Sequence, residues 1–513
     1  MTEQAEATHR TTSVSAAREA RRELRELPGP RGLPLLGNLW QLEVSRLHRI
    51  LGAWAERYGP LYRMRLRGRD VLVVGDAELI AEVLRSRPEG FRRRRALRNV
   101  MLELGIDGVF NAEGADWRRQ RKLAMYALNT AHMREFFPRL DQVTARLQRR
   151  WEAAARSGEP VDPQRDLMRF TVDVTSGLAF GHDLNTLEQT GDAIQNHLDK
   201  VFPALARRLL VPFAYWRWFK LPADRELDRA MIEVHRLVNG LIVNSRAQLE
   251  RDPARRSRPS DFLEAMLVAR DDDASGFTDA EIVGNALTML LAGEDTTANT
   301  LAWMIHYMVE HPDAQRHMRA EVDRVLGANR RVSDYATADA LPYIEAVAHE
   351  AMRLEPVAPL LVMEANHDCV VRDVAVPAGT SLFLLMAHVA AQPANFDEPP
   401  AFRPERWLEP GRAARSSKAF MPFGTGPRYC PGRHLAMLEI KLAAAMLARN
   451  FEIGRAPGSP ATREHFSFTL APKGLSVTLR LRGECRTGRP RSVFGTSEWA
   501  AKVENSALAR KRS

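Results

Sequence analysis

The sequence has few cysteines and no long apolar run. Its 513 residues include only three cysteines, Cys369, Cys430 and Cys485, widely spaced and without a CxxC pair. This spacing excludes a disulfide framework and a cysteine-based zinc site, and it suits a reducing compartment. A transmembrane anchor is not expected, because no stretch of about 18 apolar residues occurs. The first residues also lack the apolar core of a signal peptide, which favours a cytoplasmic protein.

Fixed-period repeats and long Gly/Ser linkers are also missing. The hydrophobic content of 45% is enough for a large core. The net charge of +10 raises the question of a nucleic-acid partner, but no recognised nucleic-acid-binding motif accompanies it, so none is expected. Basic residues concentrate in the tail 484–513 and in a cluster that we interpret mostly as solvated faces: Arg85, Arg87, Arg92, Arg93, Arg94, Arg95 and Arg98.

One cysteine lies in a turn of glycine and proline. Residues 423–433 read Phe-Gly-Thr-Gly-Pro-Arg-Tyr-Cys-Pro-Gly-Arg and precede a helical pattern over residues 434–450. A thiolate at Cys430 would meet the positive end of that helix dipole and nearby backbone N–H groups, which suits an axial ligand of haem. Glycines let the backbone turn closely beneath a flat macrocycle. The alternative is a buried structural cysteine beside an ordinary turn.

The pattern Phe-x-x-Gly-x-Arg-x-Cys-x-Gly in this loop resembles the haem-binding loop of the cytochrome P450 family. The resemblance implies haem b (iron protoporphyrin IX) as the cofactor and Cys430 as the axial ligand of its iron. It further implies that Phe423, Gly424 and Arg428 contact the haem. Four weaker features of the same family precede the loop in the family's order.

A long helix is predicted over residues 278–311, where the capping box Thr-Asp-Ala-Glu opens an apolar pattern and Pro312 follows it. At about 1.5 Å per residue it would be roughly 45 Å long, enough to cross a domain. Its middle, residues 292–297, reads Ala-Gly-Glu-Asp-Thr-Thr. Gly293 costs about 1 kcal/mol relative to alanine, and a locally opened helix with room for O₂ and water would explain it.

An acid followed by a hydroxyl is what proton delivery needs. The alternative is a helix kink whose threonine hydroxyls bond their own backbone. The segment resembles the distal motif of the P450 family, which implies Thr296 as the hydroxyl on the oxygen side, Asp295 as the proton-relay acid and Thr297 as support. The resemblance also implies that Ala292 and Gly293 lie beside the haem.

Trp117 and Arg121 share one face of a predicted helix whose candidate N-cap is Asp116. Two donors on one face could hold an anionic group such as a haem propionate, and the alternative is a surface arginine beside a packed tryptophan. The pair matches the Trp-x-x-x-Arg feature of the P450 helix beside the haem. Arg118, Arg119 and Lys122 point elsewhere and, with Arg433, form a candidate docking patch for an acidic protein. The alternative is a plain solvated face.

Glu350 and Arg353 are three apart on a helix predicted over residues 341–354, a spacing that alone indicates only a surface pair. Followed by Phe-Arg-Pro-Glu-Arg-Trp at 402–407, they match the P450 pattern in which Glu350, Arg353 and Arg406 form a charged network. That network would fix the cysteine loop. The segment 390–393 reads Ala-Ala-Gln-Pro where many members carry His-Arg-Asp-Pro, so the full set of propionate ligands stays open.

Helical patterns dominate residues 78–355, after a helix expected at 47–58, and the β structure is small. Strands are expected at 61–66 and 71–74, and an apolar strand at 357–362. A strand pair is expected at 374–376 and 382–385, and a hairpin at 466–470 and 475–481. The resemblance, which covers residues 27–482, implies a mainly α fold with a small β portion. It places haem between the long helix and the cysteine loop of a single P450-like domain at residues 28–482, with flexible extensions at 1–27 and 483–513.

The resemblance implies a haem-thiolate monooxygenase that inserts one atom of O₂ into an organic substrate. Ala292 and the apolar residues 358–362 near the predicted pocket indicate that this substrate is lipophilic. No flavin or iron–sulfur sequence accompanies the domain. A separate electron donor is therefore expected, a ferredoxin or flavodoxin with an NAD(P)H-dependent reductase, serving a soluble monomer. A peroxide-driven oxygenase or an isomerase remains an alternative, since fold does not determine chemistry. A haem-binding sensor would need Cys430 but not Thr296.

Overall fold

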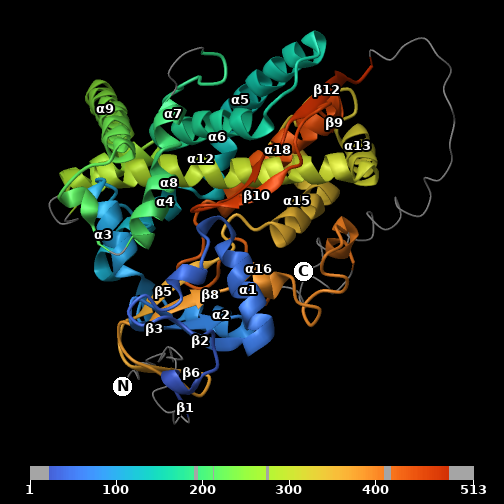
Figure 1. The fold of residues 1–513 in the computed structure, drawn as a ribbon. Helices are drawn as coiled ribbons and strands as arrows, with labels where there is room; N and C mark the ends of the chain where they lie inside the picture. The colour runs from blue at the N-terminus through green and yellow to red at the C-terminus, as the bar shows by residue number, and fades with distance from the viewer. Residues whose placement is uncertain (1–21, 190–193, 212, 273–276, 410–417, 484–513) are drawn as a thin grey trace, which may run out of the picture.

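The computed structural model describes residues 22–189, 194–211, 213–272, 277–409 and 418–483. A helical part and a smaller β part make up the fold (Figure 1). The predicted extensions 1–27 and 483–513 lie mostly outside the described residues. Part of the first was assigned wrongly: β1 (Arg22–Glu23) pairs with β7 (Val374–Val376), and Leu24 and Leu27 are buried. The folded domain therefore begins before residue 28.

The long helix α12 (Asp279–Glu310) crosses the middle of the molecule, as Figure 1 shows. The predicted capping box at Thr278 is confirmed, because Thr278 and Glu281 each bond the other's backbone N–H. Most of its surface is apolar and buried against α6 (Pro163–Phe180), α15 (Pro342–Leu354) and α18 (Arg433–Asn450). A helix packed on nearly all sides gives the site a rigid wall.

The other helices surround this centre, and their bounds follow the local signals of the sequence closely. The predicted helix at residues 47–58 is confirmed as α1, which ends at Gly59 with a positive φ. The remaining helices are α2 (Ala77–Arg85), α3 (Arg95–Glu103), α4 (Gly114–Ala127), α5 (Thr130–Ser157), α7 (Ile194–Leu198), α8 (Val201–Leu210), α9 (Pro222–Arg251), α10 (Ala254–Ser257), α11 (Phe262–Asp271), α13 (Pro312–Leu326), α14 (Tyr335–Asp339) and α16 (Met386–Ala390).

The largest sheet has the strand order β2–β3–β8–β5–β4. Strand β3 pairs antiparallel with β2 and parallel with β8, and β5 pairs antiparallel with β8 and β4. The strand bounds are β2 (Leu61–Leu66), β3 (Arg69–Val74), β4 (Phe91–Arg93), β5 (Leu361–Ala365), β6 (Cys369–Val371), β8 (Ser381–Leu384), β9 (Phe451–Arg455), β10 (Arg463–Phe466), β11 (Leu470–Lys473) and β12 (Val477–Leu481).

Strand pairing differs from the sequence-based prediction in two places. Strands β7 and β8 do not form a pair, because β7 lies between β1 and β6 while β8 lies between β3 and β5. The predicted C-terminal hairpin is also wrong: β11 pairs with β10, and β12 pairs with β9. The predicted strand at 357–362 starts later, at Leu361. Pairing depends on partners far away in the chain, which local turn signals do not identify.

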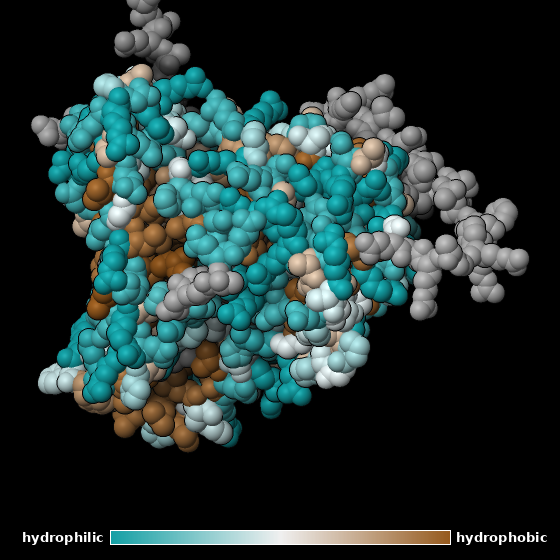
Figure 2. All heavy atoms as spheres, turned by 90° about the horizontal axis from the view of Figure 1, so that it is seen from above, coloured by the Kyte–Doolittle hydropathy of each residue, from teal (hydrophilic) through white to brown (hydrophobic). Residues whose placement is uncertain are grey.

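The surface is mostly hydrophilic, and in the view of Figure 2 hydrophobic side chains gather toward one side. Exposed apolar side chains include Trp218 and Phe219, in the connection between α8 and α9. Within the described ranges, none of the helices is both long and apolar enough to cross a membrane.

Candidate active site

The cysteine loop closes on itself just before α18. The backbone N–H of Cys430 donates to the carbonyl of Phe423 at 2.8 Å. Gly426 has a φ of 73°, and a Cβ there would lie 2.6 Å from the Cα of Arg85. Glycine is therefore required at this position both for its backbone conformation and for the close approach of α2.

Opposing effects act on the thiol of Cys430. Burial raises its pKa, whereas the backbone N–H of Gly432 and the guanidinium groups of Arg121 and Arg433 lower it. Because α18 begins at Arg433, the sulfur also lies near the positive end of a helix. These groups are suited to hold a thiolate that ligates a metal.

Helix α4 packs against the cysteine loop through its predicted pair. Arg121 donates from Nη2 to the carbonyl of Tyr429 at 2.7 Å, and its guanidinium lies 4.7 Å from the centre of the Tyr429 ring. From the loop, the guanidinium of Arg428 lies 4.8 Å from the centre of the buried Trp117 ring. The structure thus brings Trp117, Arg121, Arg428 and Cys430 together. The N-cap of α4 is Glu113, not Asp116 as predicted.

A group of buried cations lies beside this pair: Arg87, Arg93 and Arg428 share the single carboxylate of Glu113. Its Oε1 lies 2.6 Å from Nη1 of Arg428 and 3.8 Å from Nη2 of Arg87, and it accepts from the backbone N–H of Arg93 at 3.1 Å. Burial lowers the pKa of all three guanidinium groups, that of Arg87 to about 10. Among the described residues, Nε and Nη2 of Arg87 make no hydrogen bond.

This arginine cluster carries more positive than negative charge in a buried place, which favours an anionic ligand. A haem, with its two propionates, meets that requirement. The prediction that these arginines are solvated was wrong for Arg87, which is 3% exposed, and Arg93 is only partly exposed. A signal was available for Arg93, because it lies two residues after Phe91 on a strand and therefore shares its inner face.

Helix α12 presents a narrow accessible face in its middle, formed by Met289, Ala292, Gly293 and Thr296. Ala292 is exposed although its neighbours along the helix are buried or nearly so. The hydroxyl of Thr296 donates to the carbonyl of Ala292 at 2.9 Å, the local backbone bond considered above as the alternative. A flat macrocycle between this face and Cys430 would therefore meet small side chains and one hydroxyl.

Helix packing explains why position 293 is a glycine. The helix is continuous from Asp279 to Glu310, so the predicted local opening is not observed. A Cβ at Gly293 would lie 2.2 Å from Oγ1 of Thr175 on α6. The glycine lets α6 and α12 approach closely, at a cost of about 1 kcal/mol in helix propensity.

Asp295 is buried and turned toward the connection between β10 and β11. Its Oδ1 accepts from Nδ2 of Asn299 at 2.9 Å, and its Oδ2 accepts from the hydroxyl of Thr469. Burial raises its pKa, which these two donors and the charge of Lys473 partly offset. The neighbouring Glu294 is also buried, and burial raises its pKa well above the usual range. Asp295 and Thr296 are thus adjacent but bound to different partners.

Thr297 is buried, and its side chain lowers the pKa of Glu439 on α18. Glu439 is 1% exposed, and burial raises its pKa well above the usual range. Glu439 is not among the residues predicted from the sequence, although an acid between Leu438 and Ile440 in an apolar helix is a signal. The pair connects the central helix to the helix that follows the cysteine.

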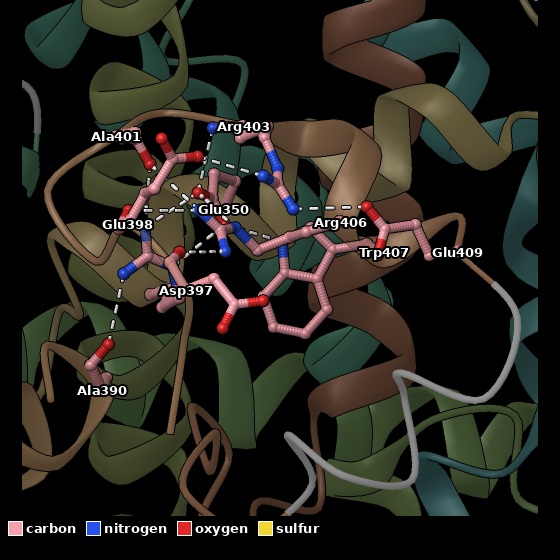
Figure 3. Close-up of polar contacts among 10 residues, drawn as sticks. Glu350, Ala390, Asp397, Glu398, Ala401, Arg403, Arg406, Trp407 and Glu409 are labelled. Carbon is pink, nitrogen blue, oxygen red and sulfur yellow. Dashed lines mark hydrogen bonds and ion pairs between the residues drawn. The ribbon is translucent and has the colours of Figure 1, made fainter. Parts of the chain in front are cut away.

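The predicted charged network is present and more extensive than expected (Figure 3). Arg353 donates to both oxygens of Glu350 at 2.8 and 3.0 Å, and Arg406 donates to Oε1 at 3.0 Å. The indole N–H of Trp407 donates to Oε2 at 2.8 Å. The remaining guanidinium donors bond to carbonyls of the segment between α16 and Trp407: Ala390, Asp397, Glu398 and Ala401.

Three phenylalanines from distant segments meet near Asp295. The rings of Phe202 and Phe468 are stacked with centroids 4.9 Å apart, and Phe110 lies 6.5 Å from Phe468. Phe468 precedes Thr469, the partner of Asp295. The segment before Phe110 is held to α12, because Val109 donates to the side chain of Asn285 at 2.8 Å. These rings form an apolar wall beside the central helix.

The candidate docking patch is smaller than predicted. Arg119 turns inward and pairs with Glu281 of α12 at 2.5 Å, so it does not belong to an outer surface. Arg118 is exposed but paired with Glu89. Lys122 and Arg433 are exposed.

The family model of cytochrome P450 matches residues 27–479. One relative is a bifunctional cytochrome P450/NADPH–P450 reductase of Gibberella moniliformis, 28% identical over 90% of this chain and 41% of its own length. Cytochrome P450 2A10 of Oryctolagus cuniculus is 28% identical over 88% of this chain and 92% of its own length. Cyclooctatin synthase of Streptomyces melanosporofaciens is 29% identical over 89% of this chain and 96% of its own length.

Proposed function

This chain belongs to the cytochrome P450 family, and we propose that it inserts one atom of O₂ into a lipophilic substrate with electrons from a separate protein. Members of the family bind haem and are monooxygenases. The observation that carries the proposal is the meeting of Cys430, at the start of α18, with a cluster of cations that lacks matching anions.

Cys430 would hold the haem iron, and Trp117, Arg121 and Arg428 would hold the propionates together with Arg87 and Arg93. Haem supplies the reductive activation of O₂ when it is bound to a thiolate. The protein places the sulfur, excludes water with Phe423 and moderates the thiolate charge through Gly432 and Arg121. Ala292 supplies a small side chain on the opposite face.

Thr296 would hold the oxygen-side proton and Asp295 would replace it from solvent. Burial raises the pKa of Asp295, so its carboxyl keeps a proton to a higher pH than an exposed aspartate would. To deliver it, the carboxyl must leave Thr469 and turn toward Thr296. Thr297, bonded to Glu439, supports the helix at this point. If this assignment holds, Thr296→Ala should lower product formed per NAD(P)H consumed. The same ratio in wild type and variant would remove Thr296 from the relay.

The substrate would be lipophilic because the wall beside α12 is formed by Phe110, Phe202 and Phe468. Apolar pockets with few polar groups bind such ligands. The electron donor would approach the side of the cysteine loop, where Lys122 and Arg433 are exposed. Charge reversal of both residues should slow electron transfer from an acidic ferredoxin or flavodoxin and weaken its salt dependence. An unchanged rate would exclude this docking patch.

The decisive experiment is the absorption spectrum of the reduced protein with CO. Thiolate ligation gives a strongly red-shifted Soret band, which we expect for the wild type and not for Cys430→His. A wild-type protein that binds haem without that band would overturn the assignment of Cys430. NAD(P)H-dependent turnover with a surrogate redox chain then separates a monooxygenase from a peroxide-driven enzyme.

A further inference from the structure

The connection between β10 and β11 joins two features of the candidate active site. It consists of residues 467–469, between the end of β10 and the start of β11. Phe468 belongs to the apolar wall beside α12, and Thr469 is the hydroxyl partner of Asp295. One short segment therefore borders both the expected substrate pocket and the expected proton-relay acid.

Both oxygens of the Asp295 carboxyl are occupied, and their two donors are anchored in different places. Oδ1 accepts from Asn299, which lies one turn further along α12 and is itself held by Nε2 of Gln164 at 2.8 Å. Oδ2 accepts from Thr469, on the β connection. Both donors are buried. The bond to Asn299 thus stays within the helix, whereas the bond to Thr469 ties the helix to a separate segment.

Thr296 lies next to Asp295 in the chain, but its hydroxyl donates to the carbonyl of Ala292. A proton passes between the two side chains only when an oxygen of Asp295 turns toward Thr296. Oδ2 is the oxygen that turns, because its donor does not belong to α12. Burial raises the pKa of Asp295, and the hydroxyl of Thr469 is the largest of the effects that lower it. Leaving Thr469 therefore also favours the protonated carboxyl.

The neighbouring Phe468 is held by aromatic stacking. Its ring lies on that of Phe202 from α8, with an angle of 8° between the ring planes. Both side chains are only partly buried, so an apolar ligand has access to them. Such a ligand can take the place of one ring and make similar contacts with the other. The stack is therefore the part of this segment that a substrate can open.

The chain is fixed again directly after Thr469. The backbone N–H of Leu470 donates to the carbonyl of Val357 at 3.0 Å, and the carbonyl of Leu470 accepts from the indole N–H of Trp303 on α12 at 3.2 Å. A displacement of Phe468 is therefore not passed along β11. It is taken up at Thr469, the residue between the moving ring and the fixed strand.

We propose that Thr469 is a positioning residue whose hydroxyl keeps Asp295 away from Thr296. A ligand that displaces Phe468 from the ring of Phe202 breaks this bond. Substrate binding and proton delivery are then coupled through one hydrogen bond, and the acid becomes available only when the pocket is filled. This inference rests on the proposed function, because it takes Asp295 as the acid of the proton relay.

The test compares two iron ligands of the haem-loaded protein, clotrimazole and imidazole. Clotrimazole is an imidazole that carries three aromatic rings, whereas imidazole itself has no group that reaches Phe468. If the larger ligand must break the bond of Thr469, the variant Thr469→Val removes that cost in advance. Titration of the Soret band should show about tenfold tighter binding of clotrimazole to Thr469→Val than to the wild type, which corresponds to 1.4 kcal/mol. The affinity for imidazole should not change.

An equal change for both ligands, or no change for clotrimazole, would overturn the proposal. Thr469→Ser keeps the hydroxyl and should bind clotrimazole like the wild type. Ser467→Ala, which removes a hydroxyl from the same connection, is the matched control and should also bind it like the wild type. A gain in either of these two variants as large as that in Thr469→Val would contradict the role of the hydroxyl.

A double-mutant cycle tests the bond itself. In an Asp295→Ala background, Thr469→Val should have no further effect, because the bond is already absent. The same gain in both backgrounds would mean that the new methyl group contacts the ligand, and it would contradict the proposal. If Asp295→Ala does not bind haem, the comparison of Thr469→Val with Thr469→Ser decides, and equal affinities contradict the proposal.

These affinities do not depend on turnover. A wild type without the red-shifted Soret band of its reduced CO complex would refute the assignment of Cys430. An intact CO band together with an unchanged clotrimazole affinity in Thr469→Val would refute only the role of Thr469.

Discussion

Two buried groups of charges in this molecule look alike in composition and differ in how completely they are bonded. Around Glu350, both carboxylate oxygens and the guanidinium groups of Arg353 and Arg406 all have hydrogen-bond partners. In the arginine cluster, Arg87 leaves two donors unused, and Oε2 of Glu113 accepts no hydrogen bond from a described residue. A saturated network serves the fold, whereas an unsaturated one has capacity for a ligand.

The difference also lies in what each group touches. The network of Glu350 reaches carbonyls between Ala390 and Ala401, so it braces the segment that leads toward the cysteine loop (Figure 3). The arginine cluster instead touches Trp117 and borders the cysteine loop itself through Arg428. The network of Glu350 therefore stabilises the path of the backbone, whereas the arginine cluster is suited to bind a ligand.

The largest expected effect comes from breaking the saturated network. Glu350→Gln leaves Arg353 and Arg406 buried without their carboxylate, which should lower the free energy of unfolding by about 3–5 kcal/mol. Urea denaturation measures it. Arg403→Gln is the control, because among the described residues that side chain pairs with the exposed carboxylates of Glu398 and Glu409, and its loss should cost less than about 1 kcal/mol. Similar losses for both variants would remove the distinction between the two groups of charges.

Part of the charged network and of the candidate site could be predicted from the sequence alone. Glu350 and Arg353 are three apart in a helix bounded by Pro342, so their contact follows from local spacing. The thiolate loop, the long helix and Trp117 with Arg121 were likewise recognisable, because together they match the motifs of one family in the same order. In the structure Trp117 and Arg121 contact the cysteine loop, and α12 packs against α18, the helix that follows this loop.

The arginine cluster as a whole could not be predicted because its burial depends on distant pairing, and the position of Arg93 two residues after Phe91 was its one local signal. Residues 92–95 are four arginines in a row, which favours a solvated face. In the fold, β4 pairs with β5, and this contact places Arg93 inside. Pairing with distant segments also explains why the strand partners of β7 and β12 were predicted wrongly. Glu439 was not predicted as a site residue because Thr297, the residue beside it, lies on another helix.

A smaller loss should follow when one bond of the saturated network is removed and the charges are kept. Trp407→Phe deletes the indole donor to Oε2 of Glu350 but preserves an aromatic ring beside Phe420. Hydrogen bonds to charged groups contribute about 1.5–3 kcal/mol, so the free energy of unfolding should fall within that range. A loss equal to that of Glu350→Gln would mean that packing, not charge saturation, holds this segment.

Removing a charge from the arginine cluster should not lower the free energy of unfolding. Arg87→Met removes a buried charge whose contact with Glu113 is long, at 3.8 Å, so the haem-free protein should be as stable as the wild type or more stable. Haem should leave the variant about tenfold faster, a difference of about 1.4 kcal/mol, as measured by transfer to an acceptor protein. Arg85→Met, at an exposed position on α2, is the control and should change neither value. A haem-free protein destabilised by several kcal/mol would show that Arg87 is structural.

The smallest effect is expected where the same Glu→Gln change is made at a carboxyl that is already neutral. Burial holds the pKa of Glu439 well above its usual range, so the folded protein keeps a proton that the unfolded chain releases above about pH 4.5. The wild type therefore loses stability as the pH rises from that value toward the pKa in the fold, and glutamine does not. Glu439→Gln should change the free energy of unfolding by less than about 1 kcal/mol at pH 5 and become relatively more stable at pH 8. A large loss that grows with pH would mean that Glu439 is ionised, and that its place beside Thr297 belongs with the charged network of Glu350.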